Sequence, residues 1–84
     1  MPQQTEQQRI RWQCRRGLLE LDYILQHFLD DHFAQAAPEE QAQFIQLLQQ
    51  QDDQLQAWLL EGIPPEHRLA LIVQRLRGIS VPHS

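Results

Sequence analysis

The sequence predicts an all-α fold, a compact bundle of five short helices. Glutamine, which favours helices, is heavily used, whereas the β-branched residues that favour strands are sparse. Hydrophobic residues make up 42 % of the 84-residue chain, a normal share for a globular protein, and they recur at helical spacing between proline and glycine breaks. We expect a single helical domain over residues 1–84, with a core from about residue 5 to residue 79 and a flexible tail at 80–84.

The first expected helix is short and polar, and it runs from roughly Thr5 to Cys14. Ile10 and, as a second candidate, Trp12 would anchor this helix in the core. Glycine is a poor helix former, so we expect the helix to end near Gly17.

The second expected helix has the strongest pattern in the chain. Its apolar residues recur at intervals of three and four, so they share one buried face. They are Leu18, Leu21, Leu25, Phe28 and Leu29, with Phe33 extending the series. Glu20 and Asp22 would lie in the first two turns, where the helix dipole favours negative charge.

The third helix is expected to begin at Pro38, because proline is tolerated in a first turn and the two glutamates that follow complement the helix dipole. It would end around Gln50. Its core face would carry Phe44, Leu47 and Leu48, with Ile45 nearby.

Two further helices are expected in the last third of the chain. Asp52 or Asp53 is the expected N-cap of the fourth helix, and Gly62 its expected stop. The fifth helix would follow the restart at Pro64 and end at Gly78. Their core faces would carry Leu55, Trp58 and Leu59 in the fourth helix, and Leu69, Ile72, Val73 and Leu76 in the fifth. Connections this short predict neighbours that run antiparallel or cross at an angle.

The charge pattern favours a protein partner. All seven basic residues are arginines, and four of them lie between residues 9 and 16 of a chain whose net charge is −4. The acidic balance argues against general affinity for nucleic acid or anionic membranes, while the basic N-terminal stretch indicates a directional surface for one acidic partner. No apolar run approaches the ~20 residues that span a bilayer, and the N-terminus lacks a secretion signal, so we expect a cytoplasmic protein.

Catalytic and metal chemistry find little support in the sequence. His27 and His32 are five residues apart, a poor spacing for a helical metal pair, and Asp31 with His27 would supply only two ligands. Cys14 has arginines beside it that could activate its thiol, but a small buried apolar residue is the favoured interpretation. No glycine-rich phosphate loop is present. We therefore expect no enzyme, no metal site and no stably bound cofactor.

One segment stands out, Arg16-Gly17-Leu18-Leu19-Glu20. Gly17 at a helix junction allows another backbone to approach closely, and Arg16 can present a planar fork to a carboxylate, phosphate or carbonyl. If the helix runs through the glycine, Glu20 lies on the same side as Arg16. The residues alone leave two interpretations open, a partner-binding surface or a plain Arg–Glu surface pair.

The same five residues match the Arg-Gly-x-x-Glu motif of the succinate dehydrogenase flavin-assembly factors, the SdhE type, and the chain resembles that family over about residues 9–76. The resemblance extends beyond the motif. It includes Arg9-Ile10, Trp12, Cys14, Arg15, Leu21-Asp22 and the later Leu55, Trp58 and Leu59. The glutamine-rich stretches and the C-terminal tail depart from the family pattern.

The resemblance implies a five-helix assembly factor that binds the flavoprotein subunit of succinate dehydrogenase, and in some bacteria that of fumarate reductase. It implies promotion of covalent FAD attachment to a histidine of that subunit, with the chemistry carried out by the flavoprotein's own residues. Carried over by position, Arg16, Gly17 and Glu20 would form the partner-binding surface, with Arg9 and Asp22 supporting it. We expect a monomer, and we expect Gly17→Arg to disrupt function without unfolding the protein.

An alternative remains open at this point. A regulatory protein-binding module of the antitoxin type would use the same surface on a different partner. Capture of the partner separates the two hypotheses.

Overall fold

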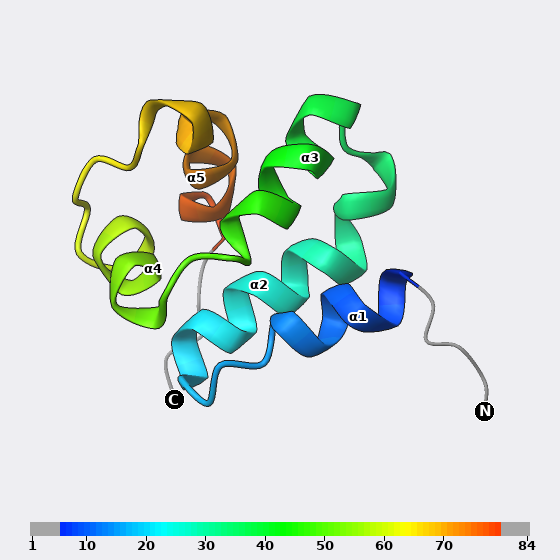
Figure 1. The fold of residues 1–84 in the computed structure, drawn as a ribbon, viewed down its shortest axis with the longest axis horizontal. Helices are drawn as coiled ribbons and strands as arrows, with labels where there is room; N and C mark the ends of the chain where they lie inside the picture. The colour runs from blue at the N-terminus through cyan, green and yellow to red at the C-terminus, as the bar shows by residue number, and fades with distance from the viewer. Residues whose placement is uncertain (1–5, 80–84) are drawn as a thin grey trace.

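The computed structural model describes residues 6–79, and this part of the chain folds into five α-helices without any strand (Figure 1). The elements, in order, are α1 (Glu6–Gln13), α2 (Leu19–Asp31), the 3-10 turn η1 (Phe33–Gln35), α3 (Pro38–Leu47), α4 (Asp52–Leu59), the 3-10 turn η2 (His67–Leu69) and α5 (Ala70–Arg77). The all-α prediction is confirmed. The expected start of the core at residue 5 and the expected tail at 80–84 lie outside the described residues.

The longest helix, α2, runs through the lower half of the molecule with α1 along one side (Figure 1). Helix α3 lies above α2, and α4 and α5 form the opposite end of the bundle (Figure 1). The apolar face predicted for α2 is buried from Leu21 onward and meets the other helices in one core, whereas Leu18 lies half-buried at the N-cap of the helix. Phe28 and Phe44 lie at its centre, with ring centroids 4.7 Å apart. Phe33 belongs to the separate turn η1 rather than to α2, and it packs against the edge of this core.

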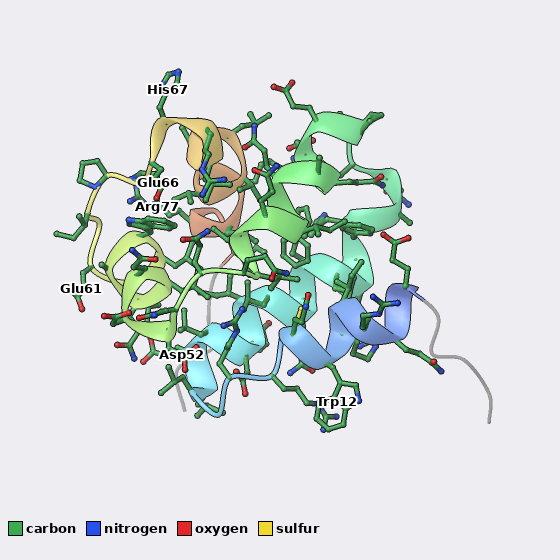
Figure 2. All side chains as sticks on the ribbon, viewed as in Figure 1. Trp12, Asp52, Glu61, Glu66, His67 and Arg77 are labelled. Atoms are coloured by element: carbon green, nitrogen blue, oxygen red, sulfur yellow. The ribbon has the colours of Figure 1, made fainter. Side chains whose placement is uncertain are left out.

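Helix α1 is anchored by Ile10 and Cys14, which are 5 % and 0 % exposed. The second anchor expected from the sequence was wrong, because the Trp12 side chain is 62 % exposed. Residues four apart share a helix face, so Cys14 lies beneath Ile10, whereas Trp12, two positions on, lies on nearly the opposite face. Figure 2 shows the Trp12 side chain projecting outward from α1 at the lower edge of the molecule.

Helix α3 begins at Pro38 as predicted but ends at Leu47, before the expected Gln50. The Gln49 N–H donates to the Gln46 carbonyl and the Gln50 N–H to the Leu47 carbonyl, at 3.1 and 3.0 Å. Bonds from residue i to residue i−3 tighten the chain into turns and stop the α-helix. The expected core residues of α3 are nevertheless buried.

The expected N-cap of α4 was wrong. Gln51 occupies that position, and Asp52 and Asp53 lie in the first turn of the helix, where they complement its dipole. Helix α4 ends at Leu59, shortly before the stop predicted at Gly62. The backbone turns at Gly62, whose φ is +76°.

Helix α5 begins later than the proline restart indicated, after the turn η2. Its first turn is capped from outside, since the Ile72 N–H donates to the Gln43 Oε1 of α3 at 3.1 Å. Arg75 of α5 and Glu40 of α3 form an ion pair at 3.0 Å. The helix ends at Gly78 as predicted. Within residues 6–79, no helix is long and apolar enough to cross a membrane.

Candidate functional site

The candidate site is the turn between α1 and α2, which contains Arg16 and Gly17. Helix α1 ends at Gln13 and α2 begins at Leu19, so the helix does not run through the glycine. Gly17 has a φ of +76°, in the left-handed region that L side chains rarely adopt. A Cβ at this position would meet nothing within 4 Å. The turn therefore requires glycine for its backbone conformation, and it leaves the space above Gly17 open.

Asp22 holds this turn from the α2 side. Its carboxylate accepts a hydrogen bond from the Arg16 N–H at 2.7 Å through Oδ1 and one from the Gly17 N–H at 3.3 Å through Oδ2. The carboxylate lies close to the start of α2, where the helix dipole also favours negative charge. Asp22 thus fixes the two amide groups on which the shape of the turn depends.

Arg16 holds the turn from the other side. Its guanidinium donates to the carbonyl of Gln13 at 2.8 Å, to the carbonyl of Gln50 at 3.0 Å and to the carbonyl of Leu48. It also forms an ion pair with Asp52 at 3.3 Å. The acceptors lie at the end of α1, in the segment that directly follows α3 and in the first turn of α4. Carbonyls at helix C-termini lack partners within their helix and carry partial negative charge, so one cation satisfies two helix ends at once.

Glu20 lies on the exposed side of the first turn of α2. The interpretation of the motif as an Arg–Glu surface pair is wrong, because the Arg16 side chain is only 15 % exposed and its charged partner is Asp52. Among the ion pairs and hydrogen bonds within residues 6–79, none involves the Glu20 side chain. Its carboxylate is therefore open to a partner.

Arg9 stands apart from the other expected site residues. It is exposed on α1 and borders a hollow with Ile45 of α3 and with Gln49, which follows that helix. No hydrogen bond or ion pair in the described part of the chain joins it to Arg16, Gly17, Glu20 or Asp22. The structure therefore brings together Arg16, Gly17 and Asp22 by direct contacts, with Glu20 beside them on α2 and Arg9 on α1 without a polar contact to any of them.

Comparison with known proteins identifies a family whose model covers this turn. A family model described as "Flavinator of succinate dehydrogenase" matches residues 8–80, nearly the whole chain. The chain belongs to this flavinator family. The match includes all five expected site residues, and it agrees with the resemblance that the Arg-Gly-x-x-Glu motif indicates.

Individual relatives support the same membership. The chain is 40 % identical over 75 residues to a protein of Shewanella oneidensis named FAD assembly factor SdhE, a match that covers 88 % of this chain and 92 % of the relative. A protein of the same name from Coxiella burnetii is 40 % identical over 73 residues, with 86 % and 89 % covered. One from Legionella pneumophila is 39 % identical over 73 residues, with 87 % and 92 % covered. No solved structure matches the chain. These relatives of the flavinator family are named as assembly factors rather than as enzymes.

Three exposed side chains near the turn did not enter the site expected from the sequence. They are Trp12, Arg15 and Leu19, and Leu19 is 86 % exposed. For Trp12 and Leu19, helical phase in the sequence could have indicated exposure. Trp12 lies out of phase with Ile10 and Cys14, and Leu19 lies out of phase with the stripe of α2, so both depart from the core pattern of their helices.

Cys14 takes no part in an exposed reactive site. The thiol is fully buried, and burial raises its pKa to about 12, against the smaller opposing effects of Arg16 and Arg11. The preferred interpretation of Cys14 as a small core residue is confirmed. A thiol with so high a pKa remains protonated and unreactive at neutral pH.

His27 of α2 and His32, which directly follows this helix, lie in a small cluster of rings. The His27 ring stacks on Tyr23 with centroids 5.6 Å apart, and its Nδ1 lies 3.3 Å from Oδ2 of Asp31. Among residues 6–79, no three His, Cys, Asp or Glu side chains are grouped so that they could hold a metal ion.

Proposed function

We propose that this protein binds the flavoprotein subunit of succinate dehydrogenase and promotes the covalent attachment of FAD to it. Membership of the flavinator family over residues 8–80 carries the proposal, and the assembly-factor names of the relatives support it. A helper of this kind has to stabilise the partner in an arrangement that favours attachment, which shifts a conformational population. Such a role needs a rigid surface rather than a catalytic centre. The assembly-factor names do not favour the regulatory antitoxin-type alternative.

The proposed contact surface has residues in two roles. Gly17 and Glu20 would contact the partner, since the space above Gly17 is open and the Glu20 carboxylate has no partner within residues 6–79. Arg16 and Asp22 would be positioning residues, because their polar groups are engaged by the turn and by the ends of α1, α3 and α4. Arg9 would extend the surface along α1.

The proposal includes a wider setting. The fumarate reductase flavoprotein would be a second client, and the protein would act as a monomer in the cytoplasm. FAD would be carried by the client rather than held stably by this chain, which has no glycine-rich phosphate loop. The net charge of −4 supports a protein partner over nucleic acid.

The direct test uses the purified flavoprotein subunit of succinate dehydrogenase, FAD and this protein. In-gel flavin fluorescence after denaturing electrophoresis reports only covalently attached flavin. We expect the signal to form faster and to a higher final level when the protein is present. A mixture of the protein with FAD alone should give no fluorescent band. Equal signal with and without the protein would contradict the proposed function.

The role of Glu20 is tested by Glu20→Gln with Glu61→Gln as the matched control. Both carboxylates are exposed, Glu20 in the first turn of α2 and Glu61 just after α4, where it adjoins the other left-handed glycine, Gly62. Neither change should alter the free energy of unfolding by more than about 0.5 kcal/mol, as is usual for surface substitutions. We expect flavin attachment to slow only with Glu20→Gln. Equal rates for the two variants would remove Glu20 from the contact surface.

A further inference from the structure

Two large apolar side chains are strongly exposed on either side of the Arg16–Gly17 turn. Trp12 on α1 is 62 % exposed and Leu19 on α2 is 86 % exposed, while Tyr23, one helical turn after Leu19, is 36 % exposed. Single exposed apolar residues are common and need no explanation. A group of them beside one turn is typical of a protein–protein contact.

These side chains border two hollows that adjoin each other. One hollow lies along α1 and is lined in part by Trp12 and Arg15. The other lies along α2 and is lined in part by Leu19 and Tyr23. Arg11 lines the first hollow and Asp30 the second, and these two residues form an ion pair at 2.6 Å that joins the walls. The hollows therefore form one continuous surface, called here the Trp12–Leu19 surface and defined by Trp12, Arg15, Leu19 and Tyr23.

The α1 side of this surface carries one cation without a carboxylate partner, whereas the hollow along α2 is lined by Asp22 and Asp30, whose carboxylates are both engaged. Of the four arginines between residues 9 and 16, Arg11 is paired with Asp30, and Arg16 is engaged by carbonyls and Asp52. The Arg15 guanidinium has no carboxylate partner within residues 6–79, and it lies 5.8 Å from the centroid of the Trp12 ring. An exposed cation beside an exposed indole is complementary to an apolar hollow that has carboxylates at its rim.

We propose that the Trp12–Leu19 surface is the apolar anchor of the contact with the flavoprotein subunit, and that Trp12 and Leu19 insert into an apolar hollow of that subunit bordered by carboxylates. This inference rests on the proposed function, which supplies the partner. The surface is continuous with the Gly17 turn through Asp22, which lines the second hollow and accepts a hydrogen bond from the Arg16 N–H. A second copy of this chain is a poorer occupant, because a two-fold contact would bring the Arg15 side chains of both copies to the same surface.

The test measures binding of the full-length protein to the purified flavoprotein subunit by titration calorimetry. Tryptophan anchors at the centre of interfaces commonly dominate affinity, so Trp12→Ala should weaken binding at least about 20-fold. Leu19→Ser should weaken it about 10-fold, as expected for the loss of one buried leucine. Arg15→Glu should slow association and reverse its salt dependence. Because these side chains are exposed, melting temperatures should stay close to that of the wild type.

The matched controls are Ile63→Ser and Leu71→Ser. Ile63 and Leu71 are 49 % and 40 % exposed, and they belong to the loop after α4 and to α5. Glu61 and Glu66, which flank this loop, lie on the far side of the molecule from Trp12 (Figure 2). Both controls should bind within about two-fold of the wild type, as is usual for substitutions outside an interface.

The outcomes separate this inference from the proposed function. If the wild-type protein fails to bind the flavoprotein, the proposed function is contradicted. If the wild type binds and Trp12→Ala and Leu19→Ser bind equally well, the inference is overturned while the function stands. Sedimentation of the wild type as a dimer that Trp12→Ala dissociates would also overturn it, because the surface would then belong to a second copy.

Discussion

The turns at Gly17 and Gly62 each contain a glycine with the same positive φ, in different surroundings. Both glycines have a φ of +76°, and a Cβ at either position would meet nothing within 4 Å. Each turn is also held by an arginine that donates to backbone carbonyls. Arg16 serves the Gly17 turn, while Arg77 donates to the carbonyls of Trp58 and Ile63, both at 2.7 Å, around Gly62.

The difference lies in burial and in the neighbouring surface. The Arg16 side chain is 15 % exposed and joins the ends of three helices, whereas Arg77 is exposed and closes one local loop. The apolar side chains beside the Gly17 turn, Trp12 and Leu19, are 62 % and 86 % exposed, whereas those beside Gly62, Leu60 and Ile63, are 39 % and 49 % exposed. A left-handed glycine with an arginine clamp is therefore a folding device that the chain uses twice, and function has to be sought in what surrounds it.

The largest expected effect on stability separates the two arginines. Arg16→Ala would leave carbonyls at two helix ends without their charged donor, and we expect it to cost about 2–3 kcal/mol of unfolding free energy. Arg77→Ala should cost about 1 kcal/mol, because water can replace an exposed donor. Urea unfolding followed by circular dichroism measures both. Equal costs would contradict the account of Arg16 as a buried clamp.

The rate of flavin attachment tests whether Arg16 supports function in addition to stability. Under conditions where both variants remain folded, Arg16→Ala should slow flavin attachment by the client, because the Gly17 turn loses its support. Arg77→Ala should leave attachment unchanged. If Arg16→Ala supports attachment at the wild-type rate while folded, Arg16 does not position the contact surface.

The next effect should be the same in both turns. Gly17→Ala and Gly62→Ala each place an L residue in the left-handed region, at a cost of about 1–2 kcal/mol. For a domain of this size that corresponds to a decrease in melting temperature of roughly 4–16 °C. Calorimetric melting should give similar decreases for the two variants. A decrease confined to one of them would mean that the two turns are not equivalent.

A third effect concerns pH and lies in the core beneath α1. Burial raises the pKa of the Cys14 thiol from about 9 to about 12, so the folded state favours the neutral thiol. This contribution is complete below pH 9 and is lost as pH rises through the folded pKa. Between these values the wild type should lose about 1.4 kcal/mol of stability per pH unit more than Cys14→Ala does. Parallel pH profiles for the two proteins would show that the thiol is not protected from ionisation.

The smallest effect is expected at the Arg11–Asp30 ion pair. The hydrogen bond and negative charge of Asp30 raise the pKa of Arg11, but both side chains are 49 % exposed. Exposed pairs contribute little, so Asp30→Asn should lower stability by less than about 1 kcal/mol, and salt should reduce the difference further. Urea unfolding at low and high salt checks this. A loss of several kcal/mol would indicate that the pair fixes α1 against α2.

Periodicity in the sequence predicted the fold well. The stripes of α2, α4 and α5 are local patterns at intervals of three and four residues, and each was found on the buried face. The prediction for Trp12 fails because a short polar helix has few apolar residues, and few residues define the phase of a buried face poorly. Ile10 and Cys14, four residues apart, carried the correct signal.

The candidate site was harder to predict because its contacts are not local. Arg16 reaches Leu48, Gln50 and Asp52, more than 30 residues away, so an analysis of neighbouring residues could pair it only with Glu20. The same contact engages the Asp52 carboxylate, which lies in the first turn of α4 rather than at its N-cap. The motif identified the position of the turn, whereas the division into positioning and exposed residues required the fold.

The most direct test of the central claim compares Gly17→Arg with Gly62→Arg in flavin attachment. The two changes impose the same backbone strain at equally open positions, so they should destabilise the protein alike while leaving it folded. In-gel fluorescence of the succinate dehydrogenase flavoprotein would be measured without the protein, with the wild type and with each variant. We expect Gly62→Arg to match the wild type and Gly17→Arg to fall to the level seen without the protein. Equal signals from the two folded variants would contradict the assignment of the Gly17 turn as the functional surface.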